Sequence, residues 1–364
     1  MKLADVIDQL VEERGLDKST LSTIVCEGML AAYTKRYPDL KLHCEFDKKS
    51  GEVFILIEKE VANSVDDEDL QISLRKARSI QEDIEVGQRV KVPFDGKIGR
   101  IEILRAKQVI ANSIRKIETS AIYEEFKSKE GTIVTGAIHK IERNGATVKV
   151  GDAMAFLPKS LAIPGEKIIP GYSIRALLKE VLLEPRNDNQ LILDRVSEKF
   201  LHRLFELEIP EVFEKLVEIK KIVRIPGYKS KVAVVSHDKN IDPVGTCVGI
   251  NGARIKPILK ELNSEKVDVI TWSDSLEILI RDALKPARIN RVELVDDQNA
   301  QVWLDEDQRS LAIGKMGQNI TLASRLTGVN IHLMQSEPRV DQSMESPMTL
   351  DATDADAYLQ EDRD

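Results

Sequence analysis

The amino-acid sequence predicts a multidomain α+β protein, and three observations carry this prediction. Apolar residues recur at helical spacing around a predicted strand hairpin in the first third of the chain. From Gly131 the apolar pattern changes to a period of two, which is typical of β-strands. After residue 230 one order of elements, namely strand, helix, glycine loop, helix and strand, occurs twice. A chain of 364 residues is long enough to give each of these parts its own core.

The first part, residues 1–129, is expected to be an α/β domain. Its predicted elements are two amphipathic helices at 3–11 and 21–30, strands at 41–47, 52–58 and 89–95, and a long amphipathic helix at 100–129. The long helix either covers the core of this domain or connects the domain to the next one. The polar segment between Ala62 and Asp83 contains a run of acidic residues, which predicts a solvated surface segment.

Residues 130–199 are expected to form a small β-barrel. Their five short predicted strands resemble the S1 version of the OB fold, most closely in AFLP at 155–158 and LDR at 193–195. Many S1 domains stack bases on aromatic residues of the second strand, where this chain has Asn144 and Thr147. Because a base stacked on an aromatic ring contributes about 1 to 3 kcal/mol, we expect this barrel to bind RNA more weakly than a typical relative.

Four side chains of the barrel remain as candidates for RNA contact: Lys140, Arg143, Phe156 and Arg195. The alternative, that the phenylalanine lies in the core and that the charges are only solvated, stays equally open for them.

A loop with glycines at both ends, Gly249-Ile250-Asn251-Gly252, joins two short predicted helices in IDPVGTCVGINGARIKPILKEL. Such glycines allow a sugar-phosphate backbone to approach the main chain, and the N–H groups that open the second helix favour an anion. Arg254 and Lys256 add positive charge beside the loop. KH domains use this arrangement to hold about four nucleotides of a single strand. Since two glycines three positions apart are common, a simple helix-ending turn is the alternative.

The same context recurs 65 positions later around the loop Gly314-Lys315-Met316-Gly317. This repeat favours a tandem of type II KH domains, the first at residues 200–285 and the second at 286–334. The second loop carries a lysine where the first has Ile250, so we expect the second loop to bind RNA more strongly.

Three polar residues after the second loop are further candidates for contact with phosphates or base edges: Gln318, Asn319 and Arg325. For Asn319, stabilisation of the turn is the alternative that we rank lower.

The net charge of −8 argues against a nucleic-acid-binding protein until its distribution is considered. The segment 335–364 carries −7 of this charge, from nine acidic residues against two arginines, which leaves the rest of the chain at −1. Low apolar content and like charge predict a disordered acidic tail. Any basic surface must therefore be local to a groove.

No catalytic, metal or cofactor site is expected. The five histidines lie in separate predicted elements, and the chain lacks the spacings of a P-loop, of HExxH and of a cysteine metal knuckle. Cys26, Cys44 and Cys247 are expected to be reduced and buried. The acidic start of the chain is unlike a signal peptide, and no apolar run could span a membrane, so we expect a cytoplasmic protein that does not bind membranes.

The order of these parts identifies a family. The head, the long helix, the S1-like barrel and the strings FLHRLFELEIPEVFEKLVEIKKIVRIPGYKSKVAV, DPVGTCVGINGARI and IGKMGQNITLASRLTG resemble the bacterial transcription elongation and termination factor NusA. The resemblance covers nearly the whole chain up to Met334. It implies that the first domain docks on core RNA polymerase near the RNA exit channel. It also implies that the barrel and the KH domains guide nascent single-stranded RNA.

The resemblance further implies a monomeric transcription factor that modulates pausing, termination and, with other elongation factors, antitermination. Two alternatives use the same RNA-binding parts. One is a translation or ribosome-assembly factor, and the less favoured one is an accessory subunit of an RNA-processing nuclease. The partner of the first domain separates these alternatives.

Overall fold

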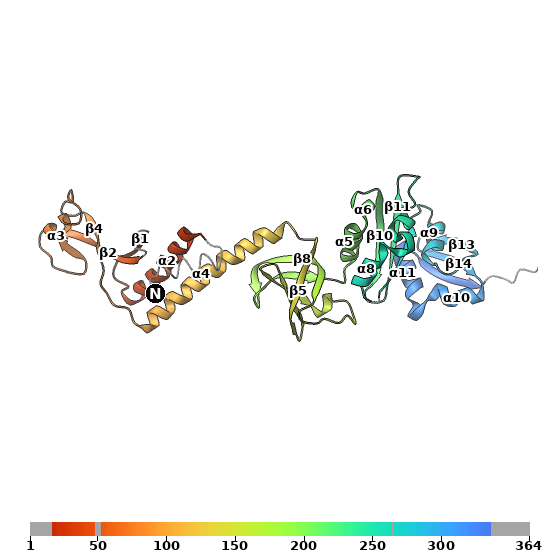
Figure 1. Cartoon of the computed structure of the whole chain (residues 1–364), viewed down its shortest axis with the longest axis horizontal. Coiled ribbons are helices and arrows are strands. Elements are labelled where there is room, and N and C mark those ends of the chain that lie inside the picture. Colours follow the sequence, from red (N-terminus) through yellow and green to blue (C-terminus); the bar gives the residue numbers. More distant parts are fainter. Residues whose placement is uncertain (1–16, 48–51, 264, 336–364) are drawn as a thin grey trace, which may run out of the picture. The chain divides into compact units, whose positions relative to one another are not determined.

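The computed structural model describes residues 17–47, 52–263 and 265–335 (Figure 1). The helix expected at 3–11 and the acidic tail beyond residue 335 lie outside the described residues. The chain divides into two compact units. Unit 1 comprises the residues up to 162 together with 168–194, and unit 2 comprises 163–167 together with the residues from 195 onward. Within the described residues, no helix is both long enough and apolar enough to cross a membrane.

The head of unit 1 is a helix on a small sheet. Its elements are α2 (Lys18–Arg36), β1 (Leu42–Asp47), β2 (Glu52–Ala62), β3 (Gln71–Ser73), α3 (Leu74–Arg78) and β4 (Arg89–Pro93). Strand β2 pairs with the other three strands. The helix α2 begins where the Asp17 carboxylate accepts a 2.8 Å hydrogen bond from the Thr20 amide, which satisfies one free N–H of the first turn.

The prediction of a purely solvated segment between Ala62 and Asp83 is wrong. Strand β3 and helix α3 lie within it, and Ile72 and Ala77 are buried together with Ile84. These side chains pack against strands β2 and β4 through buried valines. Isolated apolar residues among many charges thus form a small second core, which charge counting alone did not reveal.

The long helix was predicted correctly and is α4 (Arg100–Lys127). It begins at Gly99, whose amide donates a 2.9 Å hydrogen bond to the Glu102 carboxylate. Near the head it crosses α2 at Gly28, where a Cβ atom would overlap the Ile110 side chain, so the glycine permits the close approach. At its other end Phe126 is buried in the core of the barrel.

The barrel of unit 1 has five strands: β5 (Ile133–Glu142), β6 (Gly145–Val150), β7 (Ala153–Pro158), β8 (Ser173–Arg186) and β9 (Asn189–Asp194). They close in the order β5-β6-β7-β9-β8, which is the strand order of the OB fold. Alternate residues of β7, namely Ala153, Ala155 and Leu157, point into the core, as the period of two requires. The predicted barrel is confirmed.

Unit 2 contains two copies of one pattern. The first copy has α5 (Glu198–Glu208), α6 (Pro210–Phe213), β10 (Val217–Ile225), β11 (Lys229–Ser236), α7 (Pro243–Val248), α8 (Ile255–Glu261) and β12 (Lys266–Thr271). The second has α9 (Leu276–Ala283), β13 (Arg291–Asp296), β14 (Asn299–Leu304), α10 (Glu306–Ile313), α11 (Gln318–Thr327) and β15 (Asn330–Gln335).

Each copy has a three-stranded sheet in which the first two strands are antiparallel and the last is parallel to the middle one. This is the expected type II KH arrangement.

One continuous core holds the two copies together. Buried residues from the first copy, including Val223 and Ala233, belong to the same cluster as Ile280, Leu322 and Leu326 of the second. Helix α9 belongs by packing to the second copy, because it contacts α11 and β13. The boundary that we expected at residue 286 therefore separates this helix from the strands that it covers.

A buried ion pair fixes the base of the first copy. The Arg224 guanidinium and the Glu265 carboxylate form two parallel hydrogen bonds of 2.8 Å each, with side chains 1% and 0% exposed. Arg224 also donates to the carbonyl oxygens of Arg195 and Ser197 at 2.8 and 3.0 Å. Glu265 accepts from the Gly227 amide at 2.9 Å. Both charges thus have their hydrogen-bonding capacity filled inside the protein.

Candidate nucleic-acid interface

The two glycine loops, 249–252 and 314–317, have the same backbone conformation. Their first residues have φ and ψ of 73° and 168° at Gly249 and of 71° and 175° at Gly314, a region that is open almost only to glycine. Their third residues, Asn251 and Met316, are left-handed, with φ of 53° and 54°. The repeat inferred from the sequence is therefore a repeat in geometry.

The first glycine of each loop is packed against the helix that follows. A Cβ atom on Gly314 would lie 2.7 Å from the Cβ of Asn319 and 3.1 Å from the backbone nitrogen of the same residue. A Cβ atom on Gly249 would lie 3.1 Å from the Arg254 amide nitrogen. These two positions require glycine for the fold itself.

The last glycine of each loop has room for a Cβ atom. A Cβ atom on Gly317 would meet nothing within 4 Å, and one on Gly252 would approach Ile255 and Lys256 no closer than 3.7 Å. Packing among the described residues therefore does not demand glycine at these two positions. Their φ angles are nevertheless positive, 75° at Gly252 and 73° at Gly317. The bare backbone is free to meet a ligand from outside.

The side chains between the glycines project into solvent. Ile250 is 87% exposed and Met316 is 83% exposed, while Asn251 and Lys315 are also exposed. Ile250 and Lys315 occupy equivalent positions, so only the second loop presents a charge at this point. A single cation near a backbone phosphate makes binding sensitive to salt, which gives the two loops different electrostatic character.

Beside the first loop, Arg254 and Lys256 differ in availability. Arg254 is half-buried, donates to the Thr246 carbonyl oxygen at 2.9 Å and pairs with Glu211 at 2.9 Å, so its charge is partly neutralised within the protein. Lys256 is exposed, has no ion-pair partner among the residues that the structure describes, and runs past Gly252. Lys256 is thus the better placed of the two predicted cations.

Asn319 does not reach the surface, which corrects our prediction of an RNA contact. Its side chain is 2% exposed, and its amide nitrogen donates to the carbonyl oxygens of Leu284 and Ala312 at 3.1 and 3.2 Å. Its amide oxygen accepts from the Lys229 ammonium at 3.0 Å. The residue closes the second loop against the helix and ties it to the first copy. The alternative that we ranked lower is the observed one.

The other two candidates after the second loop lie at opposite ends of α11. Gln318 is the first residue of this helix and is half-buried beside the loop. Arg325 is exposed in the last turn of the helix, away from the loop that it was expected to assist. At 1.5 Å rise per residue, about 10 Å of helix separates Gln318 from Arg325.

A groove of about 410 Å³ lies between the two copies. The hairpin turn of the first copy and the start of β12 form one wall, with Gly227, Tyr228, Lys229 and Lys266. The second loop and the start of α11 form the other wall, with Gly314, Lys315, Gln318 and Asn319. Sequence reasoning missed the first wall, although the Pro-Gly-Tyr-Lys string at 226–229 shows a turn that carries an aromatic and a basic residue.

On the barrel, Phe156 lies on the outer face of β7 and is half-buried, outside the core cluster. It pairs across strands with Thr147 and Ile192. Lys140 is exposed but pairs with Glu142 at 2.9 Å, and this lysine, followed by Thr147, holds the pKa of the Glu142 carboxyl below its usual range.

Arg143 is exposed in the turn between β5 and β6. It lies on the same hairpin as Lys140, so the barrel offers these two cations and Phe156 as surface candidates.

Arg195 is not available for RNA. It is 3% exposed and pairs with Glu166 at 2.9 Å and with Glu261 at 2.6 Å. Its guanidinium carbon also lies 5.3 Å from the centre of the Phe200 ring. The prediction that Arg195 contacts RNA is therefore corrected. The residue has a structural role in unit 2.

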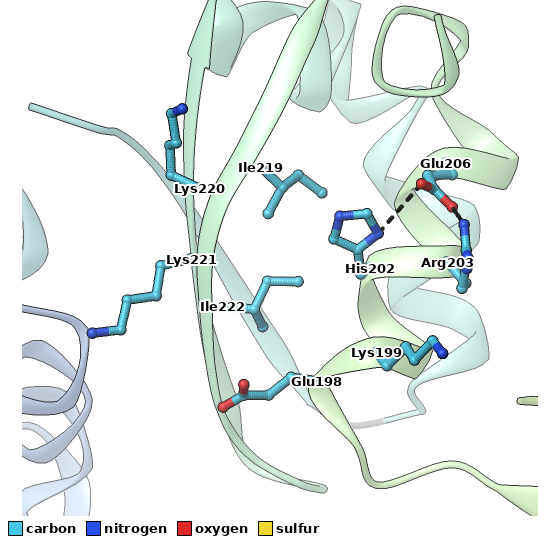
Figure 2. A pocket seen from close by; sticks show the side chains of 9 residues that line it. All are labelled: Glu198, Lys199, His202, Arg203, Glu206, Ile219, Lys220, Lys221 and Ile222. Carbon is cyan, nitrogen blue, oxygen red and sulfur yellow. Dashed lines mark hydrogen bonds and ion pairs between the residues drawn. The ribbon is translucent and has the colours of Figure 1, made fainter. Parts of the chain in front are cut away.

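A second groove, of about 420 Å³, lies between α5 and β10 (Figure 2). Ile219 and Ile222 point toward His202 from the strand, whereas Lys220 and Lys221 point the other way. Arg203 and His202 are both partnered by Glu206, at 2.5 and 3.5 Å. This groove contains no residue of the two loops.

Among the described residues, no three histidine, cysteine or acidic side chains gather as metal ligands would. Cys26, Cys44 and Cys247 are free cysteines, and the first two are half-buried rather than buried as expected. Cys247 is buried in α7, and burial raises the pKa of its thiol to about 12, so the thiol stays protonated at neutral pH.

Replacing Ile250 with lysine should give the first loop the electrostatic character of the second. The side chain is 87% exposed, so the change leaves the core untouched. One added phosphate contact should steepen the slope of log affinity against log salt for single-stranded RNA by about 0.7 and tighten binding at low salt. The Ile250→Gln variant is the control that adds polarity without charge. If Ile250→Lys has the same salt slope as Ile250→Gln and the parent, the first loop does not face a phosphate.

Comparison with known proteins finds family models that match three parts of the chain. A sequence model of the NusA N-terminal domain matches residues 2–120, one of the NusA-like first KH domain matches 195–272, and one of the NusA-like second KH domain matches 276–340. The last match begins at α9, in agreement with the packing of this helix on the second copy.

Curated relatives cover most of the chain. The transcription termination/antitermination protein NusA of Thermus thermophilus is 36% identical over 350 residues, which span 92% of this chain and 90% of that protein. The NusA of Bacillus subtilis is 32% identical over 335 residues, which span 91% of this chain and 90% of that protein. That of Borreliella burgdorferi is 37% identical over 325 residues, which span 88% of this chain and 67% of that protein. The chain therefore belongs to the NusA family.

Proposed function

We propose that this protein is an RNA-binding transcription factor that holds single-stranded RNA at its two glycine loops and in the groove beside the second loop. The last glycines of the loops carry this proposal, because each is only half-buried and a Cβ atom there would overlap no described atom. Lys256 and Lys315 flank these glycines with positive charge. The names of the curated relatives, termination and antitermination proteins, support a role in transcription rather than in translation.

A single strand fits this surface better than a duplex. The cations are few and local to the loops, whereas a duplex that carries one charge per about 1.7 Å needs an extended basic face. The groove of about 410 Å³ is concave and lies next to the second loop, so it can receive one unstacked nucleotide. A strand held at the second loop therefore lies next to this groove.

Placing aspartate at Gly252 or Gly317 tests this proposal. A carboxylate at the open position repels a phosphate, so RNA affinity should fall, and the salt slope should become shallower by about 0.7 for each phosphate that the loop no longer holds. Gly317→Asp should cost more than Gly252→Asp, because the second loop carries Lys315.

Asparagine at the same positions is the matched control. Asparagine and aspartate both tolerate left-handed backbone, so the two variants share the strain of a positive φ and differ only in charge. A thermal melt of each variant records that strain. If the aspartate variants bind RNA with the affinity and salt slope of the asparagine variants, the loops do not hold the phosphate backbone.

The barrel is a further candidate for RNA contact. Phe156 offers part of a ring on the outer face of β7, and Lys140 and Arg143 offer charge on the neighbouring hairpin. The polar residues at 144 and 147 supply no second ring, so the barrel contributes less to affinity than the tandem copies.

For the head of unit 1 we propose RNA polymerase as the partner, which would bring the RNA-binding units to the transcript. The match of residues 2–120 to the NusA N-terminal domain supports this assignment. A fragment of residues 1–129 should co-migrate with core polymerase on a sizing column, and the fragment 195–364 should not. If the full chain binds polymerase and the first fragment does not, the docking surface lies elsewhere.

A further inference from the structure

Tyr228 stands in the hairpin turn between β10 and β11 and is 53% exposed. Its backbone is fixed on both sides. The Tyr228 amide donates to the Ile225 carbonyl oxygen at 3.0 Å, and the Lys266 amide donates to the Tyr228 carbonyl oxygen at 3.0 Å. The exposed aromatic ring thus lies on a turn whose backbone is already ordered before any ligand binds.

The buried ion pair of the first copy holds the same turn from below. The Glu265 carboxylate, which Arg224 neutralises, accepts a 2.9 Å hydrogen bond from the amide of Gly227, next to the tyrosine. A turn that is already ordered loses less conformational entropy when a ligand binds to the side chain that it carries.

The opposite wall of the groove is equally fixed. Lys229, adjacent to the tyrosine, pairs with Asp268 at 2.7 Å and donates to the Asn319 amide oxygen at 3.0 Å. Asn319 is buried and lies in the first turn of the helix behind the second loop. The contact from Lys229 to Asn319 therefore sets the distance between the turn that carries Tyr228 and the loop that carries Lys315.

Two further cations stand on the groove without partners among the described residues. Lys266 and Lys315 are exposed, and neither forms an ion pair with another described residue. An aromatic face flanked by free ammonium groups suits a nucleotide, because the ring receives the base while the cations receive the neighbouring phosphates.

We propose that Tyr228 is a base-stacking residue, and that the groove between the two copies is a subsite for one nucleotide of the single strand. This inference rests on the proposed RNA-binding function. The stacked base can be of any identity, since every base has a π face. Tyr228 thus supplies the aromatic contact that Asn144 and Thr147 do not supply on the barrel.

Removal of the ring should weaken RNA binding without changing its salt dependence. Tyr228→Leu should lower the affinity of the full chain about 5- to 150-fold, the range that corresponds to one stacked base. The salt slope should stay unchanged, because the strand keeps all of its phosphate contacts. Tyr228→Phe keeps the ring and should bind like the parent. Lys315→Ala should also weaken binding, but it should make the salt slope shallower by about 0.7, because a phosphate contact is lost.

A pyrimidine-only RNA with one 2-aminopurine at successive positions locates the stacked base. With the parent and with Tyr228→Phe, one position should lose fluorescence on binding, and this loss should vanish with Tyr228→Leu. The control is Phe213→Leu, which removes a 73% exposed aromatic side chain from α6, outside the groove. Thermal melts of all variants should coincide with that of the parent.

Two outcomes separate this inference from the function on which it rests. If Gly317→Asp weakens RNA binding but Tyr228→Leu binds and quenches like the parent, the stacking role is wrong and the loop function stands. If neither variant changes RNA binding, the proposed RNA path across the tandem copies fails together with the inference.

Discussion

Replacing Arg224 with methionine should lower the free energy of unfolding of unit 2 by about 3 to 5 kcal/mol, because the change leaves a buried carboxylate without its partner. The Glu265 side chain is 0% exposed, so water cannot replace the missing guanidinium. The carbonyl oxygens of Arg195 and Ser197 lose a donor in addition. This is the largest single effect that we expect from any polar side chain of the chain.

Urea unfolding followed by tryptophan fluorescence measures this effect in the full chain. Both tryptophans, Trp272 and Trp303, lie in unit 2, so the signal reports this unit alone. The control is Lys285→Met, which breaks a surface pair with Asp282 in the same unit and should cost at most about 1 kcal/mol. A second change, Glu265→Leu, should restore part of the stability, since apolar replacements of buried pairs are often tolerated. A decrease below about 1 kcal/mol for Arg224→Met would contradict the buried pair.

The two glycines of the second loop should differ in their response to the same substitution. Gly314→Ala should lower the free energy of unfolding by about 2 to 5 kcal/mol, from an almost glycine-only backbone region and from the 2.7 Å approach to Asn319. Gly317→Ala should cost only about 1 to 2 kcal/mol, the penalty of a left-handed residue, because no atom lies within 4 Å of its added methyl.

The same pair of variants separates fold from binding. We expect Gly317→Ala to reduce RNA affinity while its unfolding transition moves less than that of Gly314→Ala. Gly314→Ala should shift the transition, measured again by tryptophan fluorescence in urea. Equal destabilisation by both alanines would contradict the division between a packed first glycine and an open last glycine.

Local patterns were sufficient to predict most of the fold. The period of two gave the five barrel strands, the period near 3.6 gave the long helix, and glycine spacing gave both loops. These features depend on neighbours within a few residues. Their prediction from one sequence succeeded because backbone preference and apolar pattern agree there.

The errors concern residues whose partners are distant in the sequence. Arg195 resembled a surface arginine because Glu166 and Glu261, which bury its charge, lie 29 and 66 positions away. Asn319 resembled a loop polar residue because its partner Lys229 lies 90 positions away. Tyr228 was not predicted as a site residue, because only the packing of the two copies places its turn beside the second loop. No local pattern encodes such contacts.

The shared core of the tandem would allow two weak RNA contacts, one at each glycine loop, to strengthen each other. A strand bound at one loop, as proposed, would not have to search for the other, because the two copies pack into one core and Lys229 ties them together. The second contact becomes intramolecular, with an effective concentration set by the reach of the RNA rather than by the protein. A loop with as little charge as the first one can therefore still contribute to avidity, provided that the strand is long enough to span both.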